Sequence, residues 1–165
     1  MSDPHGQGAL DTFPRLLMNH ARTRPDHPAM REKAFGIWQT YSWADVAREV
    51  RAIACGLAEL GFRRGDRLAI IGDNRPRLYW SVAACQCLGG IPVMLYQDAV
   101  AEEMVYVLQD AEIKIAVVED QEQVDKMLEI KAEAAFLEHV VYDDARGMRH
   151  YGDTFLLGLD ELIGM

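Results

Sequence analysis

Hydrophobic residues at the start of the chain recur at helical spacing. Asp11 and Thr12 are residue types that cap helices, and Pro14 suits the first helical turn because its missing N–H has no partner there. Pro25 ends the pattern. The predicted helix has one apolar face, made by Phe13, Leu16, Leu17 and His20.

Two further patterns precede residue 62. Residues 29–41 alternate between apolar and polar side chains, which predicts a hairpin that turns near Gly36. Ser42 and Asp45 have the spacing of a capping box and lead into apolar positions at helical spacing. Gly61 stands where a left-handed residue ends many helices. We therefore expect a half-buried helix between the capping box and this glycine.

From Gly65 onward, short apolar runs alternate with amphipathic segments. The runs show no alternation of apolar and polar residues, which is typical of strands covered on both faces. Such an order predicts parallel strands joined by right-handed crossovers, in an α/β class with a mainly parallel, doubly wound sheet. The expected strands are 67–72, 91–96, 113–118 and 139–142, and the expected helices are 76–88, 101–110, 124–135 and 159–163.

Composition and charge narrow the function classes. Half of the 165 residues are hydrophobic, which is enough for one folded domain over 12–165 after a flexible leader at 1–11. The net charge of −9 repels nucleic acid phosphates, so a nucleic-acid partner is not expected. No transmembrane segment and no signal peptide are recognisable. We expect a cytoplasmic protein.

The cysteines and histidines suggest no special chemistry. Cys85 and Cys87 form a C-x-C pair that lacks the spacing of a redox or zinc motif, and Cys55 stands alone. All three are expected to be reduced and packed. The five histidines lack the spacing of a metal site on a helix, so no metal-binding residue is predicted.

Polar residues follow three of the expected strands, where open parallel sheets bind their ligands. These segments are 72–75, 97–99 and 119–121. None contains a glycine-rich phosphate loop. We expect Asp73 or Asn74 to cap the following helix rather than act in catalysis. Arg75 and Arg77 could hold an anion, but a surface position is the favoured interpretation.

Two charged clusters have structural explanations. Asp98, Glu102 and Glu103 are expected to stabilise the start of a helix through its dipole. The basic run 63–67 is expected to be a solvated connection. No nucleophile elbow is present. The residues alone therefore assign no catalytic, cofactor-binding or metal-binding residue and name no function.

Six short segments, in this order, resemble the N-terminal part of AMP-forming acyl-CoA synthetases, and the long-chain fatty acid–CoA ligase branch most. The resemblance covers about residues 10 to 145. The segments are TYSW at 40–43, GLAELG at 56–61, GDRLAI at 65–70, DNRP at 73–76, LGGIPV at 88–93 and AEEM at 101–104.

The resemblance implies a ligase that activates a fatty acid with ATP and Mg²⁺ as an acyl-adenylate and transfers the acyl group to coenzyme A. It also implies that the phosphate loop, the adenine and ribose contacts and the C-terminal lysine of the family belong to a missing C-terminal remainder. The chain is then an N-terminal scaffold portion of the large domain, inactive alone and binding no cofactor itself. Its uncovered surface is expected to favour self-association into a homo-oligomer.

Two other interpretations remain open at this point. A non-catalytic interaction module derived from the ligase fold would look the same in this sequence. A signalling receiver domain shares the α/β alternation, but it needs a phosphorylatable Asp after its third strand and a later Lys. Here the third strand ends in Val118, Glu119 and Asp120, and no later strand offers that Lys.

Overall fold

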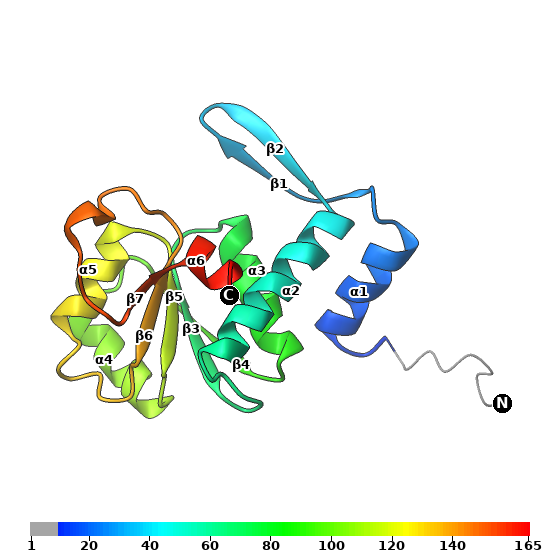
Figure 1. Ribbon diagram of the computed structural model, residues 1–165. Coiled ribbons are helices and arrows are strands. Elements are labelled where there is room, and N and C mark those ends of the chain that lie inside the picture. Colours follow the sequence, from blue (N-terminus) through cyan, green and yellow to red (C-terminus); the bar gives the residue numbers. More distant parts are fainter. Residues whose placement is uncertain (1–9) are drawn as a thin grey trace.

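A parallel sheet of five strands organises the chain (Figure 1). The structure, a computed structural model, describes residues 10–165. The strand order is β4-β3-β5-β6-β7, and every neighbouring pair in this sheet is parallel. The predicted doubly wound α/β class is therefore confirmed. The strands are β3 (Arg67–Ile71), β4 (Ile91–Leu95), β5 (Ile115–Val118), β6 (His139–Tyr142) and β7 (Leu156–Gly158).

Helices cover both faces of this sheet (Figure 1). On one face α2, α3 and α6 pack against Ile70 and Val117, with α1 outside α2. On the other face α4 and α5 pack against Ile71 and Val118. The helices are α1 (Phe13–Thr23), α2 (Trp43–Glu59), α3 (Pro76–Cys87), α4 (Ala101–Asp110), α5 (Gln121–Glu129) and α6 (Leu159–Ile163), with a short 3₁₀ turn, η1 (Met148–His150).

The central strands owe their lack of alternation to this double cover. Neighbouring residues of a strand point to opposite faces, and in β3 and β5 both faces are buried. Ile70 and Val117 are each 1% exposed or less. The sheet centre is therefore the main apolar core of the molecule.

Capping residues set the ends of α1 and α2 as the sequence indicated. Ser42 accepts a hydrogen bond from the N–H of Asp45 at 3.2 Å, and the Asp45 carboxylate accepts one from the N–H of Ser42 at 3.0 Å. Thr12 caps α1 by accepting from the N–H of Arg15. Gly61 has a φ of +86°, the left-handed conformation expected after α2.

A two-stranded antiparallel hairpin lies apart from the sheet, formed by β1 (Pro28–Ala34) and β2 (Ile37–Ser42). Its base packs on α3, where the ring of Tyr41 meets Trp80 edge-on at 5.0 Å and Met30 accepts a hydrogen bond from the Trp80 indole. Its far end projects away from the body (Figure 1). The predicted hairpin with its turn near Gly36 is confirmed.

Several predicted boundaries were wrong. The helix expected at 124–135 is α5, which starts earlier because Asp120 caps it and ends at Glu129. The strand expected from residue 113 starts at Ile115, because the N–H of Ile113 still bonds to the end of α4. The strand β7 was not predicted. Its three residues carry no recognisable pattern, and its extended form depends on pairing with β6.

Two further expectations concern the N-terminus. Phe13 does not share the buried face of α1, since 73% of its side chain is exposed while Leu17 is buried. Residues 1–9 of the expected flexible leader lie outside the described residues. No helix between residues 10 and 165 is long and apolar enough to cross a membrane.

Candidate functional site

The topological switch point of the sheet lies between β3 and β5. The strand β3 leads into α3 on one face of the sheet, and its neighbour β5 leads into α5 on the other. The loops after these strands therefore diverge and leave a crevice between them. In open α/β sheets this switch point is the usual ligand site.

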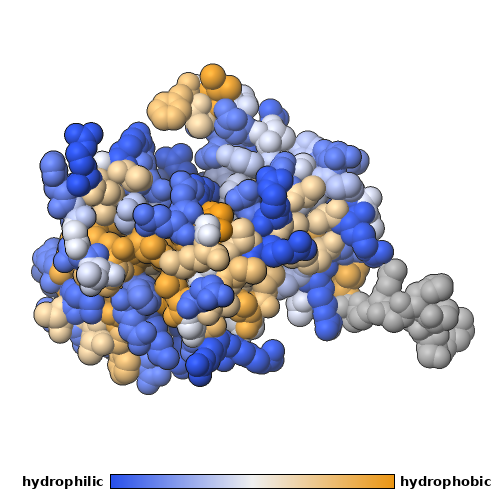
Figure 2. Space-filling model, viewed as in Figure 1, coloured by the Kyte–Doolittle hydropathy of each residue, from blue (hydrophilic) through white to orange (hydrophobic). Residues whose placement is uncertain are grey.

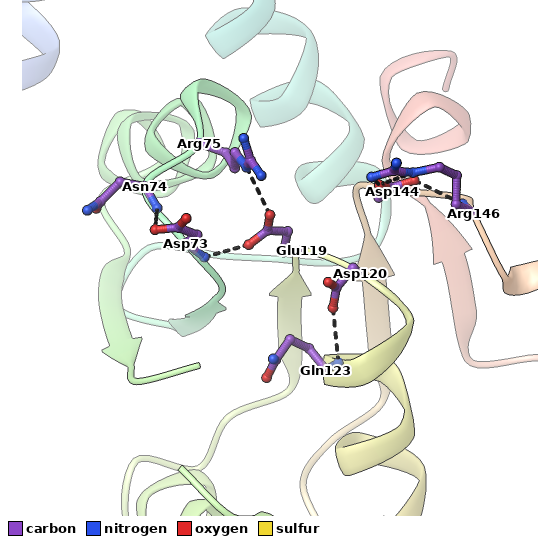
Figure 3. A network of polar contacts seen from close by, with 8 residues as sticks. All are labelled: Asp73, Asn74, Arg75, Glu119, Asp120, Gln123, Asp144 and Arg146. Carbon is purple, nitrogen blue, oxygen red and sulfur yellow. Dashed lines mark hydrogen bonds and ion pairs between the residues drawn. The ribbon is translucent and has the colours of Figure 1, made fainter. Parts of the chain in front are cut away.

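Glu119, which directly follows β5, fills this crevice (Figure 3). Its carboxylate accepts a hydrogen bond from the N–H of Asp73 at 2.5 Å and another from the Nε of Arg75 at 2.9 Å. The bond from Arg75 raises the pKa of that guanidinium above its ordinary value. A Cβ on Gly72 would lie 2.5 Å from the Cβ of Glu119. The crevice is thus closed by a side chain of the protein itself.

The predicted caps at Asp73 and Asn74 were wrong. Arg75 is the N-cap residue of α3, which starts at Pro76 without a side-chain cap. Asp73 and Asn74 stand two residues and one residue before the N-cap position, too early to reach the free N–H groups of the helix. The Asp73 carboxylate accepts from the N–H of Asn74 instead, and the Asn74 side chain accepts from the hydroxyl of Tyr79 at 2.8 Å.

The other two predicted polar segments, 97–99 and 119–121, both form hydrogen bonds with α5. Asp120 caps that helix by accepting from the N–H of Gln123 (Figure 3). The carbonyl of Gln97, after β4, accepts hydrogen bonds from the side chains of Gln123 and Lys126. A separate pocket of about 420 Å³ lies between residues 72–74, after β3, and residues 94–98, at the end of β4.

Three charged residues that the sequence analysis did not group together form an ion-pair chain beside the crevice. Arg77 of α3 contacts Asp143, which follows β6, at 3.1 Å and Asp160 of α6 at 2.5 Å. Burial raises the pKa of Asp143 to about 6, and the carboxylates of Asp160 and Asp144 add to this effect while Arg77 opposes it. Asp143 could have been found, since it follows a strand as the other candidates do. Asp160 could not, because α6 reaches this edge only in the folded chain.

The largest hollow over this edge has a volume of about 580 Å³ and is lined by the hairpin as well as by the strand ends. Three arginines line it, and each is paired with a carboxylate. The pairs are Arg75 with Glu119, Arg77 with Asp143 and Asp160, and Arg146 with Asp144. The expectation that Arg75 and Arg77 lie on the surface holds for Arg75, while Arg77 is half-buried in its ion pairs.

The remaining charged clusters lie where the sequence indicated. Glu102 and Glu103 occupy the first turn of α4, and Asp98 is exposed before it. The run 63–67 connects α2 to β3, and Arg67 pairs with Glu112 at 3.4 Å. Within residues 10–165, no group of three or more His, Cys, Asp or Glu side chains could hold a metal ion.

The cysteines are only partly as predicted. Cys85 is buried, and burial raises its pKa to about 12. Cys55 and Cys87 are exposed, contrary to the expected packing, because they lie on the outer sides of α2 and α3. Partial burial still raises the pKa of Cys87, so neither Cys85 nor Cys87 is an activated thiolate.

The fold places the chain among α/β proteins with a doubly wound parallel sheet. Its sequence matches the family of AMP-binding enzymes over residues 17–153, and the chain belongs to that family. The resemblance to acyl-CoA synthetases is thereby confirmed.

Relatives of two sizes match the chain. The long-chain-fatty-acid–CoA ligase FadD15 of Mycobacterium bovis is 28% identical over 140 residues, which are 84% of this chain and 23% of FadD15. The uncharacterized protein Rv1549 of Mycobacterium tuberculosis is 36% identical over 120 residues, which are 73% of this chain and 65% of Rv1549. The chain therefore spans less than a quarter of the length of the ligase and about two thirds of the shorter relative.

A solved structure confirms the fold. Acetoacetyl-CoA synthetase from Streptomyces lividans superimposes with a TM-score of 0.81 and 23% identity, over 92% of this chain and 25% of the synthetase. At this identity the likeness concerns the fold alone.

The family name implies a nucleotide, and the crevice does not fit its phosphates. A phosphate at a switch point binds free backbone N–H groups or cations. Here the N–H of Asp73 and the guanidinium of Arg75 are both engaged by Glu119, whose negative charge would repel a phosphate. At the switch point, the groups of these two residues that could bind a phosphate are therefore already engaged within the chain.

Proposed function

We propose that the chain is the N-terminal scaffold portion of an ATP-dependent, AMP-forming long-chain fatty acid–CoA ligase, and that it is inactive alone. The family match and the FadD15 relative support the reaction class. The observation that carries the scaffold role is the switch point closed by Glu119. A chain of this family whose crevice is filled from within contributes architecture rather than reacting groups.

In the proposed complete enzyme, a fatty acid is joined to the thiol of coenzyme A while ATP is split into AMP and pyrophosphate, with Mg²⁺ balancing the phosphate charge. The residues described here hold the sheet on which the remaining parts are built. The ion pairs of Arg77 fix α3, the end of β6 and α6 relative to one another. We place this activity in the cytoplasm.

The first experiment measures pyrophosphate release from ATP, Mg²⁺, coenzyme A and palmitate. We expect no release by the chain alone and full release by FadD15 assayed beside it. Turnover by the chain alone would contradict the scaffold role, because it would require a reacting site within these residues.

The second experiment tests the scaffold directly. Residues 17–153 replace the aligned segment of FadD15, and the chimera is assayed with palmitate. We expect activity in the chimera and none in FadD15 without the segment. Two chimeras serve as matched controls: Ile70→Ala should lower the temperature at which activity is lost, while Ile37→Ala should not. A chimera that is folded by circular dichroism but inactive would overturn the proposal.

The shorter relative favours a second candidate function. Rv1549 is only slightly longer than this chain, since 120 aligned residues make up 65% of it. A polypeptide of this size could act as a non-catalytic interaction module with the ligase fold. A folded but inactive chimera would favour this candidate over the scaffold role.

A further inference from the structure

The tip of the hairpin concentrates exposed apolar side chains, and Phe35 there also borders the hollow over the strand ends. Phe35 is 94% exposed, Ile37 66% and Trp38 59%. Figure 2 shows this hydrophobic tip at the top of the molecule, above a mostly hydrophilic surface. The base of the hairpin is anchored on α3 through Tyr41 and Trp80, so the tip is held out from a fixed support.

The turn itself is not built for stability. Phe35 and Gly36 form a two-residue turn with φ values of +49° and +82°. Such a turn favours Asn, Asp or Gly at both positions. A bulky side chain in the left-handed region is strained, and strain of this kind is often found at functional positions. The chain thus places a phenylalanine where folding alone favours a small polar residue.

One face of the hairpin adds cations beside the aromatic residues. Lys33 and Trp38 are cross-strand partners, and Arg31 lies on the same face two residues away. The guanidinium of Arg31 sits over the Trp38 ring at 5.3 Å. Tryptophan and flexible cations together are typical of the boundary between water and lipid.

The shape of the tip favours a lipid surface over a protein partner. Large aromatic side chains bury roughly 150–250 Å² each, so three side chains offer less than the roughly 800 Å² that a stable protein interface takes from each partner. The tip is convex and requires no complementary cavity in its partner. A fluid bilayer boundary accommodates such a projection.

We propose that the hairpin tip inserts into the surface of a lipid bilayer and docks the protein there. Apolar insertion drives the binding. The hairpin carries two cations, Arg31 and Lys33, and one anion, Glu32, whereas the whole chain has a net charge of −9. Anionic lipids therefore attract the tip but repel the acidic body. Because the two effects oppose each other, the proposed binding does not depend on anionic lipid and takes place on zwitterionic phosphatidylcholine. This inference is independent of the proposed ligase function.

The test is flotation of the chain with phosphatidylcholine vesicles. We expect the unchanged chain to float, and Phe35→Ser with Ile37→Ser to lower the partition coefficient at least tenfold. Tyr106→Ser on α4, where the side chain is 72% exposed, and Met94→Ser on the edge strand β4 are matched controls that should bind as before.

A second readout locates the tip in the lipid. Phosphatidylcholine with brominated acyl chains should quench the tryptophan fluorescence of the chain, and Trp38→Phe should remove most of this quenching. Failure to float, floating unaffected by the tip substitutions, or quenching that persists in Trp38→Phe would each overturn the proposal. So would loss of binding in Met94→Ser, or sedimentation showing that the tip joins two copies without lipid.

Discussion

The hairpin and the centre of the parallel sheet are both β-structure, yet they place similar residues in opposite environments. Ile70 in β3 is 1% exposed and has helices on both sides of its sheet, whereas Ile37 in β2 is 66% exposed. The sheet centre forms its backbone hydrogen bonds and buries its apolar side chains within the chain. Beyond its base, the hairpin forms its backbone hydrogen bonds but leaves its apolar side chains exposed. Stability is therefore concentrated in the sheet, and the tip is free to serve another purpose.

The sharpest test of this contrast makes the same substitution in both regions. Ile70→Ala leaves a cavity between β3 and its covering helices, and we expect the free energy of unfolding to fall by about 2–5 kcal/mol. Ile37→Ala should change it by no more than about 0.5 kcal/mol. Urea denaturation followed by circular dichroism measures both. Equal losses would show that the hairpin contributes to the core after all.

The second prediction concerns the buried carboxyl group at the end of β6. The pKa of Asp143 is about 6 in the fold and 3.8 in the reference state, so the unfolded chain releases this proton at lower pH. The free energy of unfolding should therefore fall as pH rises from about 4 to about 6, by on the order of 2–3 kcal/mol, and level off above.

Comparison with Asp143→Asn isolates this effect, since the amide cannot ionise while Arg77 keeps Asp160 as its partner. The difference in unfolding free energy between the two proteins should grow through this pH window. Asp98→Asn, at an exposed position after β4, should follow the unchanged chain. A pH-independent difference for Asp143→Asn would contradict the prediction.

A third pair of substitutions compares two glycines. Gly72 has a φ of +151°, and a Cβ there would meet Glu119 at 2.5 Å and Leu78 at 2.7 Å. Gly72→Ala should lose about 1–3 kcal/mol of unfolding free energy, because the chain must shift at the closed crevice. Gly36 has a φ of +82° but no atom within 4 Å, so Gly36→Ala should lose about 1 kcal/mol from the backbone alone. Thermal denaturation should show the larger loss of stability for Gly72→Ala and the smaller loss for Gly36→Ala. The reverse order would show that the residues around Gly72 shift to accept the new Cβ at little cost.

The smallest expected effect has the opposite sign. Phe35→Asn replaces a strained residue by one that tolerates the left-handed region, so the free energy of unfolding should rise by about 0.5–1 kcal/mol. The same variant should bind phosphatidylcholine vesicles more weakly. Denaturation and flotation on one preparation check both, and a loss of stability would mean that the Phe35 ring packs in the fold.

The helices and central strands of this chain could be predicted from local patterns. The capping box of Ser42 and Asp45 and the apolar run of β3 depend on residues close in sequence, and each formed where expected. The edge elements were less predictable. The strand β7 has three residues and is extended only because β6 lies beside it.

The candidate site shows the same division more strongly. The sequence by itself determined that polar segments follow the strands. A parallel strand that is buried on both faces consists of apolar residues, so it must end where polar residues begin. Only the tertiary structure decided that Glu119 faces Asp73 and Arg75, and that Arg77 joins Asp143 to Asp160. These contacts join residues 44 to 83 positions apart, so their partners are set by strand order and helix placement rather than by any local pattern.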